Sequence, residues 1–397
     1  FEILKLSVGT FINAMTGEDC TYYPVASNVK KDLFNLADVY TDAVFAPLLE
    51  TETFAREGYH LKPPPPGDSE GVPEVDGIVF NEMKAAFSQP EEKLERVLMQ
   101  HLLPETFYGF ESGGDPEAIP DLTYETFAAY HRTYYHPSNA YIVCYGDISP
   151  FDYLAFLEDK FSGFARRTPP FHPRHHPRWR SPQCRRTSYP VEADAATENS
   201  TFHVLGWLAG DTLAASEQIA MDILALILFG NDAAPLKKRL IDEQVGSDLL
   251  LAGAAGSGPD IVFSVGVKGS EPDLADHFVH TVTSCLQELA EQPIPEGTVT
   301  NAFRQAAYRY REITHTFPLE VQQRILESWL YDDRAPLTFL SGGALLENCR
   351  AAYRRNPGLF NDMIRDRLLN NPHRLQILLE PDTTWRLLQS MLLVNWS

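Results

Sequence analysis

The sequence predicts an α+β protein built from two related domains. Its 397 residues are 44% apolar, which is too long for one ordinary hydrophobic core and enough to fill two. Segments with the apolar spacing of helices alternate with short apolar runs typical of strands. One strand-plus-helix pattern in the middle of the chain returns near its end, which indicates a weak internal duplication.

The first elements are a hairpin and a helix. Thr10 to Thr16 has the composition of a strand, Gly17-Glu18-Asp19 supplies a turn, and Cys20 to Val25 returns as the second strand. From Lys31 to Phe45 the apolar residues recur at helical spacing, and Pro47 ends the segment.

Further helices and the repeated pattern follow. The proline run Pro63 to Pro66 predicts an exposed loop. The repeated pattern is a strand from Ala140 to Tyr145 after His136-Pro137-Ser138-Asn139, matched by a strand from Arg374 to Leu379 after Asn370-Asn371-Pro372-His373 and a helix from about Asp382. The other helices are predicted at about Pro73 to Phe87, Glu91 to Leu103, Tyr124 to Tyr135 and Pro150 to Phe161.

The segment from Arg166 to Pro190 is rich in proline and arginine and predicts a linker or loop. It divides the chain into a first domain at 1–162, a linker at 163–190 and a second domain at 191–397. A basic nucleic-acid-binding arm is the alternative, which the acidic background disfavours.

Three histidines lie in this segment: His172, His175 and His176. They could be taken for a metal cluster, but a proline-broken segment gives them no regular ligand spacing. We therefore expect a solvated loop.

The second domain is predicted to be a sheet covered by amphipathic helices, whose apolar stripes we interpret as core packing. Its strands are Thr201 to Trp207, Leu249 to Ala255 and Asp260 to Val267, and its helices are Ser216 to Phe229, Asp273 to Glu291 and Glu296 to Arg311.

Composition excludes several classes of function. A net charge of −21 disfavours nucleic acid as a partner and favours basic ligands, although it could serve solubility alone. Five scattered cysteines predict neither a disulfide framework nor a cysteine zinc site, so a reducing compartment is expected. No apolar run is long enough to span a membrane. A start at Phe1 without Met or targeting segment predicts a fragment.

Glu82 is the candidate metal ligand. On a helix its neighbours three and four residues away are Ile78, Val79, Ala85 and Ala86, so its carboxylate is expected on an apolar face. An unpaired charge buried there would be costly, which makes a cation the natural partner. The alternative is a glutamate that reaches solvent or pairs with an arginine.

Ordered motifs resemble the presequence-protease branch of the pitrilysin superfamily, whose members are inverzincin-type zinc peptidases. These motifs are Thr10-Phe11-Ile12-Asn13-Ala14-Met15-Thr16, Cys20-Thr21-Tyr22-Tyr23-Pro24-Val25-Ala26-Ser27, Gly77-Ile78-Val79-Phe80-Asn81-Glu82-Met83-Lys84, Ser112-Gly113-Gly114-Asp115-Pro116, Ile119-Pro120-Asp121-Leu122-Thr123 and His136-Pro137-Ser138-Asn139-Ala140. Weaker resemblance covers the rest. The resemblance as a whole implies two pitrilysin-like domains, each a mostly antiparallel sheet covered by helices. It also implies that Glu82 is the third zinc ligand and that Asn13 and Ala14 are peptide-binding residues.

The sequence departs from this family in one decisive respect. The family takes two zinc-binding histidines and a general-base glutamate from an H-x-x-E-H helix, and this motif occurs nowhere in the chain. The resemblance therefore implies zinc that needs two histidines from an upstream segment, and no catalytic residue within these 397. The upstream segment and the C-terminal half of the same enzyme are the implied partners.

The resemblance implies an enzyme that degrades targeting peptides and other short, basic, unstructured peptides, with zinc-activated water attacking the scissile carbonyl. The strand bearing Asn13 and Ala14 would align the peptide by β-augmentation, although Asn13 could instead be an edge residue with local bonds. An organelle matrix, mitochondrial or plastid, is the implied location, with the bacterial cytoplasm as the alternative. A non-catalytic pitrilysin-fold subunit that serves as a peptide-binding scaffold remains open; an unrelated acidic binding module would not explain the ordered motifs.

Overall fold

The computed structural model describes residues 11–64, 73–168, 174–334 and 336–384, which divide between two compact units. Unit 1 comprises residues 1–87, 111–172 and 315–326, and unit 2 comprises residues 88–110, 173–314 and 327–397. Residues 88–110 thus cluster with unit 2, and the predicted domain boundaries stay a prediction. Thr10, Pro65 and Pro66 of the predicted loop, His172, and the part beyond residue 384 of the helix expected from about Asp382 lie outside the described residues.

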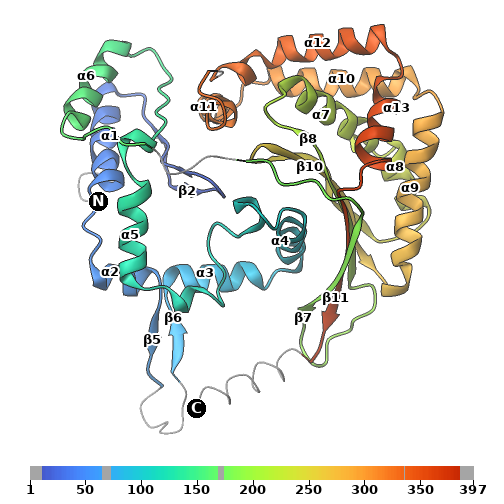
Figure 1. Cartoon of the computed structure of the whole chain (residues 1–397), viewed down its shortest axis with the longest axis horizontal. Coiled ribbons are helices and arrows are strands. Elements are labelled where there is room, and N and C mark those ends of the chain that lie inside the picture. The colour runs from blue at the N-terminus through green and yellow to red at the C-terminus, as the bar shows by residue number, and fades with distance from the viewer. Residues whose placement is uncertain (1–10, 65–72, 169–173, 335, 385–397) are drawn as a thin grey trace. The chain divides into compact units, whose positions relative to one another are not determined.

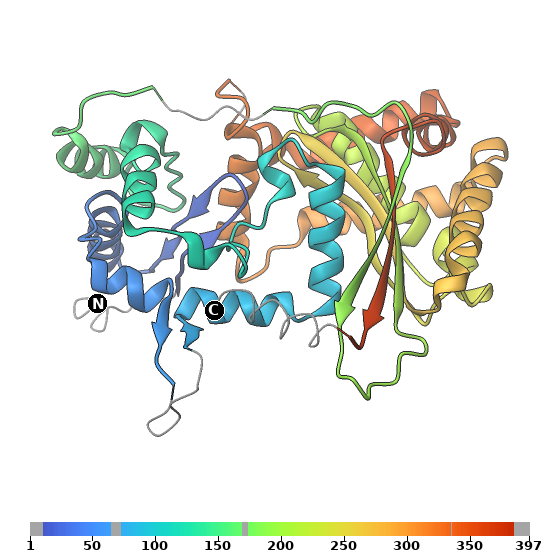
Figure 2. The same cartoon turned by 60° about the horizontal axis from the view of Figure 1, so that its bottom comes forward.

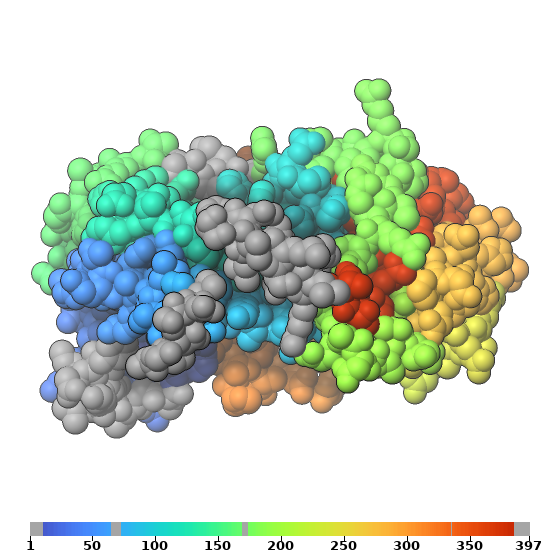
Figure 3. All heavy atoms as spheres, turned by 90° about the horizontal axis from the view of Figure 1, so that it is seen from below, coloured from blue at the N-terminus to red at the C-terminus, as the bar shows by residue number. Residues whose placement is uncertain are grey.

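Unit 2 is organised around a five-stranded sheet (Figure 1). The order is β7-β11-β8-β10-β9, and all neighbours are antiparallel except β7 and β11. Figure 3 shows the end of β11 in red against the green of β7. The strands are β7 (Gln183–Pro190), β8 (Thr201–Asp211), β9 (Asp248–Ser257), β10 (Asp260–Ser270) and β11 (Arg374–Asp382). The four strands predicted here are confirmed, but Gln183–Pro190 is an edge strand and not part of a loop.

The central strand β8 explains how both faces of the sheet are buried. Its side chains alternate, with Leu205 and Trp207 in one apolar core and Val204 and Leu208 in another. In Figures 1 and 2, α4 lies on one face and α7 and α9 on the other. The helices are α4 (Pro90–Leu102), α7 (Ala215–Phe229), α8 (Pro235–Asp242), α9 (Ala275–Glu291), α10 (Glu296–Arg311), α12 (Gly342–Arg355) and α13 (Leu359–Met363), with a π-helical turn η7 (Ile364–Leu369) and short 3-10 turns η2 (Phe107–Gly109), η5 (Pro272–Leu274) and η6 (Thr338–Ser341).

Unit 1 is mainly helical, and its described strands form three short antiparallel pairs, β1 with β4, β2 with β3 and β5 with β6. The predicted hairpin is confirmed, and the Gly17 N–H closes its turn on the Cys20 carbonyl at 2.8 Å. The strands are β1 (Phe11–Ile12), β2 (Met15–Thr16), β3 (Thr21–Tyr22), β4 (Val25–Ala26), β5 (His60–Lys62) and β6 (Glu74–Asp76).

Aromatic contacts hold the helices of unit 1 together. Phe34 of α1 contacts Tyr153 and Phe156 of α6, and Phe45 contacts Phe161 edge to face. The helices are α1 (Lys30–Phe45), α2 (Thr51–Glu57), α3 (Ile78–Phe87), α5 (Tyr124–Tyr134), α6 (Pro150–Phe161) and α11 (Phe317–Trp329), whose last three residues belong to unit 2, with 3-10 turns η3 (Ile119–Asp121) and η4 (Pro137–Asn139).

Two predictions in unit 1 are wrong in detail. The helix expected from Pro73 begins only at Ile78, because Glu74–Asp76 pairs with β5. Ala140 to Tyr145 forms no strand, since no neighbouring strand among the described residues pairs with it. Its Val143 carbonyl instead accepts a hydrogen bond from the Gln322 side chain at 3.3 Å.

None of the helices in the described part of the chain combines the length and apolar character needed to cross a membrane.

Candidate functional site

Helix α3 carries Glu82, and its start is fixed by Asp76 and Gly77. The Asp76 carboxylate accepts hydrogen bonds from the Gly77 N–H at 3.0 Å and the Asn81 side chain at 2.7 Å, and the Asn81 bond chiefly lowers the pKa of that carboxyl. Gly77 lies against the backbone of residues 58 and 59, where an added Cβ would stand 2.2 Å from the Gly58 carbonyl oxygen. A glycine is therefore needed at the helix start.

The inner face of α3 anchors the helix in unit 1. Phe80 and Met83 are buried with Ile119 in a small apolar cluster. Gly113 makes room for this packing, because a Cβ there would lie 2.4 Å from the Met83 sulfur. With these side chains inside, Glu82 is on the opposite side of the helix.

Glu82 is exposed, which corrects the argument from burial. Its neighbours Ile78 and Val79 are 55% and 37% exposed, so the apolar face that bears the carboxylate is itself uncovered. Glu82 makes no ion pair or side-chain hydrogen bond within the described ranges. A hydrated carboxylate does not require a cation, because it keeps its solvation. Its role as a metal ligand therefore stays a prediction.

The described residues do not form a zinc site by themselves. No group of three or more His, Cys, Asp or Glu side chains among them could hold a metal ion. Glu82 is an oxygen donor of the kind that binds zinc, and it is exposed, but a catalytic zinc needs three protein ligands. The other ligands would have to come from outside the described residues.

Asn13 and Ala14 lie where the hairpin ladder is interrupted, between β1 and β2. The Asn13 N–H donates to the Pro24 carbonyl at 3.3 Å. Pro24 has no N–H to return a bond to the Asn13 carbonyl, which instead accepts from the Tyr40 hydroxyl at 3.3 Å. The single strand expected from Thr10 to Thr16 is thus broken at Asn13 and Ala14.

The register places alternate backbone groups on the outer edge of this hairpin. Asn13 and Gly17 direct their N–H groups to the opposing strand, on Pro24 and Cys20. By the alternation of an antiparallel ladder, the backbone groups of Ile12 and Ala14 point outward. The Ala14 N–H donates a hydrogen bond to the Asn13 side-chain oxygen at 2.9 Å. This is the kind of local bond expected if Asn13 is an edge residue and does not contact substrate. Substrate contact at these two residues stays a prediction.

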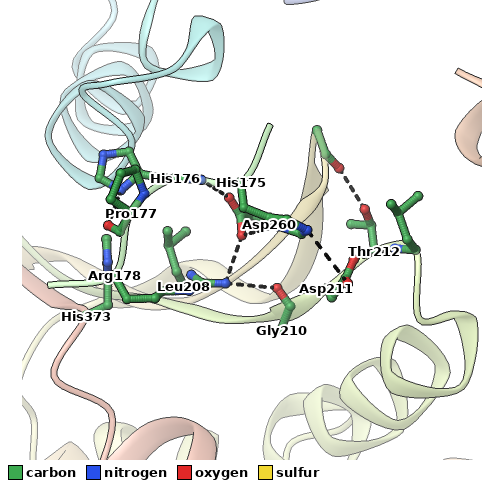
Figure 4. Close-up of polar contacts among 12 residues, drawn as sticks. His175, His176, Pro177, Arg178, Leu208, Gly210, Asp211, Thr212, Asp260 and His373 are labelled. Carbon is green, nitrogen blue, oxygen red and sulfur yellow. Dashed lines mark hydrogen bonds and ion pairs between the residues drawn. The ribbon is translucent and has the colours of Figure 1, made fainter. Parts of the chain in front are cut away.

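A second polar cluster lies in unit 2 at the start of β10 (Figure 4). The fully buried Asp260 carboxylate accepts hydrogen bonds from the Arg178 side chain at 2.8 Å and the His176 backbone N–H at 2.8 Å, and lies 3.1 Å from His175 Nδ1. The prediction of a solvated loop is therefore wrong for His176, which is buried, whereas the His175 side chain is 45% exposed. The contacts fasten this segment to the sheet.

His373 completes the cluster. It is fully buried, stacks on Trp179 with 3.8 Å between ring centroids, and its Nε2 lies 2.9 Å from the Leu102 carbonyl oxygen. Its Nδ1 accepts the Trp179 backbone N–H at 3.2 Å. Burial lowers the pKa of His373 to about 4, so the ring is neutral at pH 7.

Sequence reasoning did not identify Asp260 or the packing role of His373. The sequence pattern places Asp260 only as the first residue of a strand, and His373 only within a repeated motif. One available signal was Asp260 directly after Gly258-Pro259, where a turn brings a carboxylate to a strand end.

Comparisons with known proteins agree with this architecture. Residues 121–306 match the family model described as "Peptidase M16 inactive domain". The chain is 34% identical to Protein HypA of Clostridium perfringens, over 96% of the chain and 39% of that protein. It is also 34% identical to Presequence protease 1, chloroplastic/mitochondrial, of Arabidopsis thaliana, over 96% of the chain and 36% of that protein.

A solved structure shows the same fold. The crystal structure of a peptidase M16 inactive domain from Pseudomonas fluorescens superposes with a TM-score of 0.69 at 13% identity, covering 93% of this chain and 81% of that one. The fold and motifs thus define an α+β chain of the pitrilysin type. Within that class it is presequence-protease-like, as the motifs indicated, and it spans less than two-fifths of the two relatives' length.

Proposed function

We propose that this chain supplies the peptide-aligning edge and one zinc ligand of a zinc metalloendopeptidase that degrades targeting peptides and other short unstructured peptides. The observation that carries this proposal is the outward edge of the hairpin at Ile12 and Ala14. Among the described residues, β1 pairs only with β4 and β2 only with β3, so this edge is free of any strand partner there. An extended peptide can add to such an edge through backbone bonds with little demand on its sequence.

The substrate class follows from charge and from the relatives. Presequences are basic, and a chain with a net charge of −21 attracts them. Several relatives are named as mitochondrial or chloroplastic presequence proteases, which supports an organelle matrix as the location. The similarity to a Clostridium perfringens protein keeps a bacterial location as the alternative.

Glu82 is the proposed zinc ligand of this chain. Two histidines would have to come from an H-x-x-E-H segment outside these residues. Zinc bound there would lower the pKa of a water molecule and polarise the scissile carbonyl. The contribution of this chain is then to hold Glu82 on the outer face of α3 and to hold the peptide backbone in an extended conformation.

The peptide edge can be tested by binding. A fluorescent, basic, amphipathic peptide is titrated with the chain, and anisotropy is recorded at low and at physiological salt. We expect Ala14→Pro to weaken binding at least tenfold, because it removes an outward N–H from the edge. Asn13→Ala is the matched variant, since it frees the Ala14 N–H and leaves the edge intact. Binding should weaken as salt rises.

The two variants separate the possible outcomes. Equal affinity of the Ala14→Pro variant and the unmodified chain would overturn the proposed edge. A loss with Asn13→Ala as large as that with Ala14→Pro would instead show that the Asn13 side chain contacts the peptide directly.

A second candidate function is a non-catalytic pitrilysin-fold subunit that binds peptides as a scaffold. The matching family model is described as an inactive domain, which favours this reading. The reading frame upstream of Phe1 distinguishes the two. An H-x-x-E-H motif encoded there supports the enzyme, and a complete upstream frame without it supports the scaffold.

A further inference from the structure

An arginine-lined depression lies on unit 2, outside the proposed peptidase site. It has a volume of about 370 Å³ and is largely open to solvent. Four of its residues, Arg304, Ala307, Tyr308 and Arg311, recur at helical spacing on one face of α10. The fifth is Arg350, which comes from the neighbouring helix α12.

The charge of this depression is only partly compensated. Within the part of the chain that the structure describes, Arg304 and Arg311 make no ion pair. Arg350 binds Glu347 of its own helix at 2.7 Å and lies 5.2 Å from the centre of the Phe303 ring, which holds its guanidinium in place. Three arginines therefore line the depression, and of these Arg350 is paired with a carboxylate. Such a cluster is unusual on a chain with a net charge of −21 and favours an anionic ligand.

We propose that this depression binds a small ligand that carries several phosphate groups and an aromatic base, namely a nucleoside triphosphate. Guanidinium groups match phosphate oxygens in planar, two-point contacts. Arg304 and Arg311 are seven residues apart, or about 10 Å along the helix axis, so their long side chains can converge on neighbouring phosphates.

Tyr308 distinguishes a nucleotide from a bare phosphate chain. It lies on α10 between the two arginines, lines the same depression and is 68% exposed. An exposed aromatic ring beside cationic groups is a stacking surface for a base. The inference is independent of the peptide edge, because both helices belong to unit 2 and the hairpin belongs to unit 1.

Isothermal titration calorimetry of the full chain with ATP and with inorganic tripolyphosphate, at about 50 mM salt, tests the proposal. We expect both to bind, with ATP the tighter. The double variant Arg304→Gln/Arg311→Gln should lose at least tenfold in affinity for both. Arg185→Gln removes an exposed arginine from β7 and should change neither. Circular dichroism melting confirms that each variant is folded.

The contact between Tyr308 and the aromatic base of the nucleotide is tested with a separate variant. Tyr308→Leu should reduce the affinity for ATP to that for tripolyphosphate and leave tripolyphosphate unchanged. Equal affinity for the two ligands in the unmodified chain would overturn the nucleotide assignment. No binding of either ligand, or binding that the double arginine variant retains, would overturn the site.

Discussion

Replacing Asp260 provides the most direct test of the polar cluster in unit 2. Asp260→Ala removes a fully buried acceptor that binds Arg178 and the His176 N–H, both at 2.8 Å. Hydrogen bonds to a charged group contribute about 1.5–3 kcal/mol each, and breaking a buried ion pair costs about 3–5 kcal/mol. Arg178 is 42% exposed and can be hydrated, so we expect a loss of about 2–4 kcal/mol.

Urea unfolding followed by tryptophan fluorescence measures this loss, because Trp179 lies beside the cluster. With a slope of about 2–3 kcal/mol per molar urea, the midpoint should fall by about 1 M. Asp260→Asn keeps an acceptor for the His176 N–H and should cost about half as much. Asp194→Asn, at an exposed position, is the control and should change the midpoint little. A loss below about 0.5 kcal/mol for Asp260→Ala would refute the reasoning.

Three other predictions concern protonation, the start of α3 and zinc. Burial lowers the pKa of His373 to about 4, so as the pH falls this histidine is protonated in the unfolded chain before it is protonated in the folded one. The free energy of unfolding should therefore fall by up to about 3 kcal/mol as the pH drops from about 6.5 to 4. Urea unfolding at several pH values measures this pH dependence, and His373→Gln should reduce it. Gly77→Ala places a Cβ 2.2 Å from the Gly58 carbonyl oxygen and should lower the stability of the fold by about 2–3 kcal/mol, which thermal unfolding measures. Gly297→Ala is the control and should cause no loss of stability, because the space around Gly297 is open. The dialysed chain should hold no stoichiometric zinc and cleave no fluorogenic peptide, since Glu82 alone cannot replace three ligands; metal content near one per chain with chelator-sensitive cleavage would contradict this.

Apolar periodicity predicted much of the fold, because most helices and strands carry the pattern within their own sequence. In helices α7 and α9 and in strands β8 and β10, the apolar residues of the sequence pattern are the ones that are buried. The pattern missed β7, whose sequence is rich in arginine because it is an edge strand with exposed side chains. Its partner β11 is about 190 residues further along the chain, and no local signal reports such a pairing.

The candidate site was predicted less completely, because exposure depends on what covers a face. The helix around Glu82 was expected, but helical spacing cannot show whether Ile78 and Val79 are covered. The break at Asn13 and Ala14 can be predicted from the sequence once the two strands of the hairpin are aligned. The alignment pairs Asn13 with Pro24, and because Pro24 has no N–H, the ladder of hydrogen bonds is interrupted there.

Hydrogen exchange at the hairpin tests the central claim most directly. The chain is incubated in deuterated buffer with and without a saturating basic peptide, and exchange is resolved to single amides in residues 11–16. A peptide that pairs with the outer edge should slow exchange most at Ile12, whose N–H points outward, and less at Ala14, where the peptide must replace the bond that the Asn13 side chain accepts at 2.9 Å. Asn13 should change little, because its N–H is already bound to the Pro24 carbonyl. Unchanged exchange at Ile12 and Ala14 with peptide bound would contradict the proposal.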